Sequence, residues 1–255
     1  GTGCTSGSVA NLNGGSATVT TEGSPVIRTG SIGGGQTNSP GGKIGTAKIY
    51  VRGGDIQAQF IMENTGSGLE EDRPVFEMNG GVIRNSDVDD PDYYHVQRNG
   101  GAVYMSDGIF SMVDGVIKDC FAESGGAVYI KGVAKPMFSM TGGTISGCRS
   151  EYNGGAIYLE DGKVNLGGTG IITSCEGRKG GAICILKTSS NVPTFTMTSG
   201  TVAECSSVSD GGAVYLEGGL VTVSGGEISD NISVGGNGGG VSIATGNFIM
   251  PEGGT

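Results

Sequence analysis

Cysteine is the residue type whose spacing in this sequence most invites a chemical role. Four of the six cysteines lie three residues after an isoleucine or valine in a repeated phrase, and these are Cys120, Cys148, Cys175 and Cys205. Structural zinc sites need four ligands that converge tetrahedrally, and they commonly draw on Cys-x-x-Cys pairs, which this sequence lacks. Because regularly repeated thiols stack in a line, we predict no metal site and four buried, reduced side chains.

The two other cysteines stand outside this pattern. Cys184 takes the place that tyrosine has in other copies of the repeated phrase, and Cys4 lies in a stretch without repeats. The sequence starts Gly1-Thr2-Gly3-Cys4, without an initiator Met or a charged and apolar leader, so we expect a processed or trimmed product. A lipid-attached Cys4 is the alternative for this start.

A second candidate site is an acidic and aromatic loop that contains the only histidine of the chain. Grouped carboxylates can hold calcium, and tyrosine rings can stack on a sugar or a protein surface. Solenoid proteins also place binding surfaces on long excursions from the regular repeat. The simpler alternative is a solvated acidic loop. The candidate binding residues are Asp87, Asp89, Asp90, Asp92, Tyr93, Tyr94 and His95.

Catalytic and cofactor-dependent chemistry receive less support from the sequence. Enzymes that cleave polysaccharides hold paired carboxylates at a fixed separation, whereas the acids here gather in loops, at 70–72 and 87–92. The glycine phrases lack the lysine and the following helix of a phosphate-binding loop, and the calcium-binding phrase Gly-Gly-x-Gly-x-Asp is missing. We therefore assign no catalytic residue and no cofactor.

The composition describes a glycine-rich and acidic chain. Glycine supplies 53 of 255 residues, about three times its usual share of roughly 7%. The formal charge of −10 argues against nucleic acid as a partner, because phosphates are bound by clustered Lys and Arg. No apolar run approaches the roughly 18 residues of a transmembrane helix, so we expect no membrane-spanning segment.

Many of the glycines belong to an internal repeat, and a repeat of this kind indicates the fold. The phrase Gly-Gly-Ala-Val/Ile-Tyr and its variants begin at Gly100, Gly125, Gly154, Gly180, Gly211 and Gly238. From copy to copy the chain advances by 25, 29, 26, 31 and 27 residues. Short apolar-polar-apolar triplets alternate with the period of a strand, and no stretch has the period of a helix.

These short strands predict an all-β, single-stranded, right-handed parallel β-helix with about 25–31 residues per coil. Equivalent residues of successive coils would then lie about 4.8 Å apart, in ladders that line the core. The predicted core ladders are Met78, Met112, Met140, Leu166, Met197, Val223, and Ile83, Ile117, Ile145, Ile172, Val202, Ile228. We expect one continuous domain, with irregular N-terminal coils and a cap over 1–75 and regular repeats over 76–255.

The repeat disfavours two other interpretations. A β-propeller would need blades of about 40 to 50 residues, which is longer than the observed period. An ice-binding face would need unbroken columns of threonine, and Glu77, Asn165 and Gly167 interrupt the columns here.

The alternation of Gly-Gly-Ala-Val/Ile with Ile-x-x-Asn, seen as 228–231 followed by 238–241, resembles the repeats of bacterial adhesin-like β-helix proteins. Polymorphic outer membrane proteins of autotransporter type carry similar phrases. The resemblance covers about residues 76–250, although four units have Cys where that family commonly has Asn. It implies a binding or structural module that is extracellular or at the cell surface, with a host or cell-surface glycan or protein as partner. Pectate-lyase-like enzymes share the architecture, so a polysaccharide lyase or glycoside hydrolase acting on acidic glycans is the alternative function.

Overall fold

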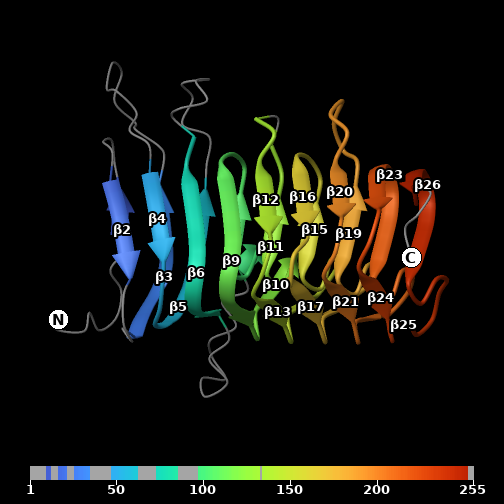
Figure 1. The fold of residues 1–255 in the computed structure, drawn as a ribbon, viewed down its shortest axis with the longest axis horizontal. Coiled ribbons are helices and arrows are strands. Elements are labelled where there is room, and N and C mark those ends of the chain that lie inside the picture. The colour runs from blue at the N-terminus through green and yellow to red at the C-terminus, as the bar shows by residue number, and fades with distance from the viewer. Residues whose placement is uncertain are drawn as a thin grey trace.

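The structure is a computed structural model that describes residues 10–12, 17–21, 26–34, 47–62, 73–85, 97–132 and 134–251. These residues form 26 β-strands and include no helix. The strands pair in parallel, and they stack coil upon coil with about 28 residues per turn (Figure 1). The prediction of a parallel β-helix is confirmed.

Three strand positions in each coil belong to one extended sheet, and a short fourth position forms a separate sheet. The strands that begin at the first position are β1 (Ala10–Leu12), β8 (Val103–Met105), β11 (Val128–Ile130), β15 (Ile157–Leu159), β19 (Ile183–Leu186), β23 (Val214–Val223) and β26 (Val241–Ile249). Those that begin at the second position are β2 (Ala17–Thr21), β4 (Ala47–Val51), β6 (Val75–Arg84), β9 (Ile109–Lys118), β12 (Met137–Met140), β16 (Lys163–Leu166) and β20 (Thr194–Met197).

The remaining strands complete the coils. The strands that begin at the third position are β3 (Val26–Gly34), β5 (Asp55–Met62), β13 (Thr144–Ser146), β17 (Ile171–Thr173), β21 (Thr201–Ala203) and β24 (Glu227–Ser229). The fourth position holds β7 (Gln97–Asn99), β10 (Phe121–Ser124), β14 (Arg149–Ser150), β18 (Glu176–Gly177), β22 (Ser206–Ser207) and β25 (Ile232–Ser233).

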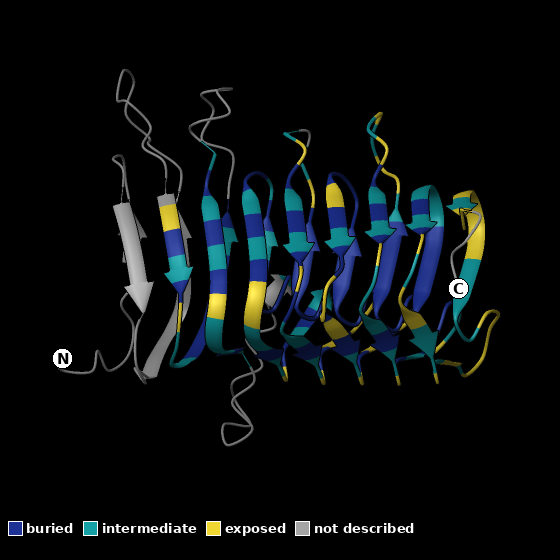
Figure 2. Ribbon diagram, viewed as in Figure 1, coloured by how far each residue is buried: buried dark blue, intermediate teal, exposed yellow. Residues whose placement is uncertain are grey.

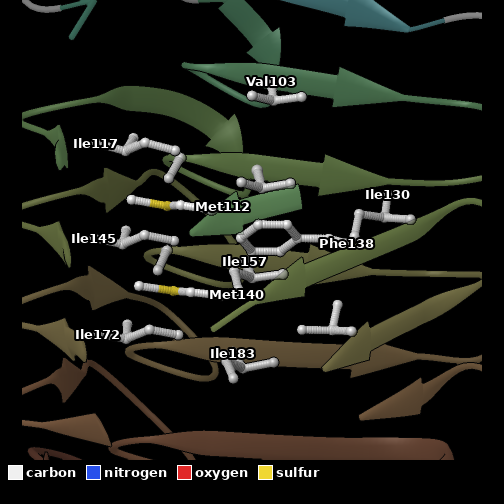
Figure 3. Packing of buried hydrophobic residues seen from close by; sticks show 14 of the residues in the cluster. Val103, Met112, Ile117, Ile130, Phe138, Met140, Ile145, Ile157, Ile172 and Ile183 are labelled. Atoms are coloured by element: carbon white, nitrogen blue, oxygen red, sulfur yellow. The ribbon is translucent and has the colours of Figure 1, made fainter. Parts of the chain in front are cut away.

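The core consists of side-chain ladders that run along the axis, because alternate residues of each strand point inward. Met112 of β9 pairs in register with Met140 of β12, and Ile117 pairs with Ile145 (Figure 3). Both predicted ladders occur in this register, and their members from β6 to β21 are buried. A third ladder is aromatic, and its Phe76 and Phe110 rings stack with centroids 4.4 Å apart. Inner faces are accordingly buried along the coil, while exposed residues lie mainly at its edges and in the last strand (Figure 2).

The same ladders continue toward the N-terminus of the regular repeats. Ile49 and Val51 of β4 are buried and pair in register with Phe76 and Met78 of β6. The cap that we predict within residues 1–75 falls mostly outside the described residues, so it stays a prediction.

A charge placed in a core ladder should destabilise the whole coil. Met140→Lys is expected to lower the free energy of unfolding by about 3 kcal/mol or more, because an unpaired ammonium would replace a buried thioether. The matched control is Ser139→Lys, whose side chain lies on the other face of β12 and should cost less than about 1 kcal/mol. Urea denaturation measures both, and equal losses would show that the register is wrong.

Candidate functional site

The acidic and aromatic loop predicted as a binding site, Asp87 to His95, lies within residues 86–96, which fall outside the described residues. Cys4 lies outside them as well, so its lipid attachment also stays a prediction. The described part of the chain holds two other columns of side chains whose types could do chemistry. One is built from cysteines and the other from tyrosines.

The first column, here called the thiol column, consists of Cys120, Cys148, Cys175 and Cys205. Each lies at the turn between the third and fourth strand positions, and each is a free thiol at most 1% exposed. Every thiol donates a hydrogen bond to the carbonyl oxygen two residues before it, at 3.2–3.4 Å. This shared bond gives the four side chains one orientation, so their sulfur atoms line up along the axis, about 4.8 Å apart.

A left-handed residue precedes each cysteine and turns the chain toward it. The φ angles are 52° at Asp119, 60° at Gly147, 55° at Ser174 and 56° at Glu204. Non-glycine residues rarely adopt this conformation, since their Cβ crowds the following carbonyl. The turn is therefore held by the packing and pairing of the coils on either side, and it fixes the direction of the thiol.

Asparagine amides mark both ends of the thiol column. Before it, Asn85 accepts a hydrogen bond from the Phe121 nitrogen at 2.7 Å and donates to the Phe121 oxygen at 2.9 Å. After it, Asn231 accepts from the Cys205 nitrogen at 2.9 Å and donates to the Val202 oxygen at 2.9 Å. The Asn231 amide therefore lies at the column position that follows Cys205, while the Asn85 amide binds the backbone of the coil that contains Cys120.

The pKa values of three members, Cys148, Cys175 and Cys205, are raised above the usual value of a thiol. Burial is the largest cause that raises the pKa of the Cys148 thiol well above its usual value. For the next two members the largest cause is a hydrogen bond with the neighbouring thiol. Cys148 raises the pKa of Cys175 in this way, and Cys175 raises the pKa of Cys205. Because the thiolate is the nucleophile, a raised pKa makes these three side chains poor targets for alkylation in the folded chain.

The second column, here called the tyrosine column, lies on the outward side of the first-position strands. Its members are Tyr104, Tyr129, Tyr158, Cys184 and Tyr215, in register from β8 to β23. The rings of Tyr129 and Tyr158 stack with centroids 5.2 Å apart, and both are at most 6% exposed. Burial raises the pKa of both phenols. Cys184 occupies the tyrosine position, as its place in the repeat predicts.

A buried carboxylate that we did not predict connects this column to the neighbouring loops. Glu160 is 6% exposed, and the Tyr129 hydroxyl donates a hydrogen bond to it at 2.5 Å. The Thr188 hydroxyl donates to the same carboxylate at 2.9 Å, and the Lys131 ammonium lies 3.1 Å from it. Next to it, Asp161 is buried and accepts a hydrogen bond from Ser189.

These contacts tie down the loops between the first and second strand positions. Residues 131–136 and 187–193 form longer connections, and the short turn at 160–162 lies in the coil between them. The longer connections leave the β-helix on the same edge, above β12 and β20 in Figure 1. The sequence signal that could have identified Glu160 is a short acidic turn between two longer loops of the repeat.

The left-handed position permits a paired test of the turn. Gly147→Ala should lower the free energy of unfolding by about 1–2 kcal/mol, because alanine carries a Cβ into the left-handed region. Ser174→Gly, at the same position one coil later, should leave stability unchanged or raise it by up to about 1 kcal/mol. Urea denaturation measures the free energy of unfolding of both variants. Losses of equal size would contradict the left-handed conformation at these two positions.

The thiols should be protected from alkylation until the chain unfolds. We expect iodoacetamide to label Cys120, Cys148, Cys175 and Cys205 only after denaturation, because all four are buried in the folded chain. Peptide mass spectrometry before and after denaturation measures the extent of labelling at each position. Rapid labelling of all four in the native chain would place the column on the outside.

Comparison with known proteins adds no family to this description. No family model, curated protein or solved structure matches the chain. The described residues also include no helix that could cross a membrane. The adhesin-like resemblance of the repeats therefore remains a prediction.

Proposed function

We propose that the chain is a secreted or cell-surface β-helix scaffold of adhesin-like type, which presents a binding surface to a glycan or a protein. The observation that carries this proposal is the looped edge: residues 131–136 and 187–193, fixed at their bases to a rigid coil. Recognition needs side chains whose positions are set in advance by a stable support. Loops that vary in length on one edge of a regular coil meet this need, because they can change while the core ladders stay in place.

The bases of these loops are held by buried acids. Glu160 and Asp161 accept hydrogen bonds from Thr188 and Ser189, and Glu160 also pairs with Lys131 of the preceding coil. Charge-assisted hydrogen bonds to buried carboxylates are stronger than exposed ones, so the loop bases form part of the rigid coil. Ser190 and Val192, in the loop at 187–193, are exposed.

The charge of this edge favours an anionic partner. Exposed lysines occur in three successive coils, at Lys131 and Lys135, at Lys163, and at Lys187. They stand out in a chain whose formal charge is −10. We therefore propose acidic glycans of a host or cell surface as the partner class for this edge. The acidic loop with Tyr93 and Tyr94 is the second proposed surface, through stacking on sugar or protein.

A glycan array that includes acidic polysaccharides, combined with a degradation screen, tests this proposal. We expect saturable binding without bond cleavage. Binding lost in Lys135→Gln with Lys187→Gln would assign the looped edge, and binding lost in Tyr93→Ala with Tyr94→Ala would assign the acidic loop. Lys118→Gln, an exposed lysine at the opposite end of β9, is the matched control and should bind normally.

Two outcomes would contradict the scaffold proposal. Cleavage of a polysaccharide that is abolished by replacing Asp89 or Asp90 would support the alternative, a β-helix lyase or hydrolase. Binding that falls equally in the Lys118 control and in the looped-edge variants would reveal only a nonspecific response to charge.

A further inference from the structure

Exposed lysines line the looped edge in three successive coils. The connections at 131–136, 160–162 and 187–193 lead into β12, β16 and β20, which lie side by side in Figure 1. Their register agrees, because Lys163 pairs with Met137 on one side and with Thr194 on the other. Coils are stacked about 4.8 Å apart, so the first and third connections are about 10 Å apart along the axis. The set, here called the lysine row, consists of Lys131, Lys135, Lys163 and Lys187.

The acidic side chains of these connections are turned away from solvent. Glu160 and Asp161 are 6% and 3% exposed, and each accepts a hydrogen bond from a hydroxyl of the third connection. Lys131 pairs with Glu160 at 3.1 Å, whereas the other three lysines of the row form no ion pair within the part of the chain that the structure describes. Positive charge is therefore what this part of the edge presents to a partner.

Acids limit the row at both of its ends. In the coil before it, the turn at 106–108 contains Asp107, which is buried in an ion pair with Arg73 at 2.8 Å. In the coil after it, the turn at 217–219 begins with Glu217, whose carboxylate lies 3.6 Å from the Lys179 ammonium. Neither turn contains a lysine, so the row covers three coils.

The weakness of exposed ion pairs decides what kind of anion this row can bind. One exposed pair strengthens binding by no more than about fivefold, so a single acidic sugar at one lysine would be held too weakly for recognition. A chain that carries several anionic groups gains from each lysine that it reaches, since every contact after the first is intramolecular. Lysine is a compact point charge on a flexible stem, so it suits a carboxylate or a sulfate equally.

We propose that the lysine row binds an internal segment of a linear acidic polysaccharide, which lies along the axis of the β-helix and bridges three coils. The inference rests on the proposed function and specifies its partner, a polymer with a carboxylate or a sulfate on its repeating unit. The three connections contain no aromatic residue on which the bases of a single-stranded nucleic acid could stack. Together with the formal charge of −10, this favours a glycan over a nucleic acid.

Oligouronates of graded length test the size of the site. Isothermal titration of the full chain compares a monouronate, a tetramer and an octamer. We expect affinity to rise with length, and one octamer to bind per chain, because the same segment contacts the whole row. A monouronate that binds as tightly as the octamer at equal carboxylate concentration, or several octamers bound per chain, would overturn the proposal.

Substitutions in the row test which lysines the segment reaches. Lys135→Gln, Lys163→Gln and Lys187→Gln should each weaken octamer binding about two- to fivefold, and the triple variant should lose about the product of the three. Lys118→Gln, an exposed lysine at another edge, is the matched control and should bind like the unchanged chain. Circular dichroism checks that each variant folds. Full affinity in the triple variant would exclude the row.

Carbodiimide coupling reads the direction of the bound segment without any substitution. The reagent joins an oligouronate carboxyl group to a lysine amine as an amide, and mass spectrometry of the digested chain identifies the lysines joined to one octamer. We expect a single octamer to join Lys135 with Lys187, which lie in the first and third connections. Coupling of each octamer within one connection alone would contradict an axial orientation.

Three further probes separate the sources of negative charge. A heparin octamer that binds while the oligouronate does not would assign sulfate, and the reverse would assign carboxylate. Single-stranded DNA of equal charge that binds as tightly as either would overturn the assignment to a glycan. Binding of a short or neutral glycan that is unchanged in the triple variant would overturn the lysine row and leave the scaffold proposal standing, whereas a chain that binds no glycan would contradict both.

Discussion

The close approach of backbones at the glycine pairs is the constraint on which the rest of the structure depends. At Gly126 a Cβ atom would lie 2.2 Å from the carbonyl oxygen of Gly155 in the next coil, and that oxygen belongs to backbone that cannot move aside. The preceding Gly125 has a φ of 62°, which turns the chain into the first-position strand. The hydrogen bonds beside this contact form only when the two coils come this close, for example the bond from the Ala127 nitrogen to the Ala156 oxygen at 2.9 Å. A side chain here would hold two coils apart, and every ladder would lose its spacing.

Because of that spacing, each residue lies against the equivalent residues of the coils before and after it. Only some residue types tolerate such stacking. Phenylalanine rings stack, and thiols line up while bonding to their own backbone. Like charges in one column would repel at this distance, whereas Arg149 and Glu176, which are in register on the exterior, have opposite charges. The buried Glu160 has a lysine of opposite charge, Lys131, at the equivalent position of the preceding coil, and it also accepts hydrogen bonds from Tyr129 and Thr188. Acids are thus kept at edges and loops, where neighbouring coils differ.

The same physics explains what the sequence could predict. Ladders such as Met112 with Met140 depend on equivalent positions alone, so the repeat predicts them, and it also predicts that Cys184 stands among tyrosines. The contacts of Glu160 involve loops of unequal length, which have no equivalent from coil to coil. Asn85 was missed because it follows its isoleucine by two residues, whereas Asn231 follows by three. At the left-handed turn Gly147, and more weakly Asp119, carry a signal in their residue type, whereas the conformation of Ser174 or Glu204 comes from the coils that enclose it.

Interior and edge of the coil are coupled only weakly. Between Leu159 and Lys163 the chain makes a short turn, and between their register partners Ile185 and Thr194 it makes a much longer loop. The strands on both sides of the two connections nevertheless pair in register. Loop length and loop charge can therefore change without moving a single ladder, which suits an edge that recognises a partner. The thiol column depends in turn on coil spacing and on the turn before each cysteine, so its arrangement should persist whatever the loops bind.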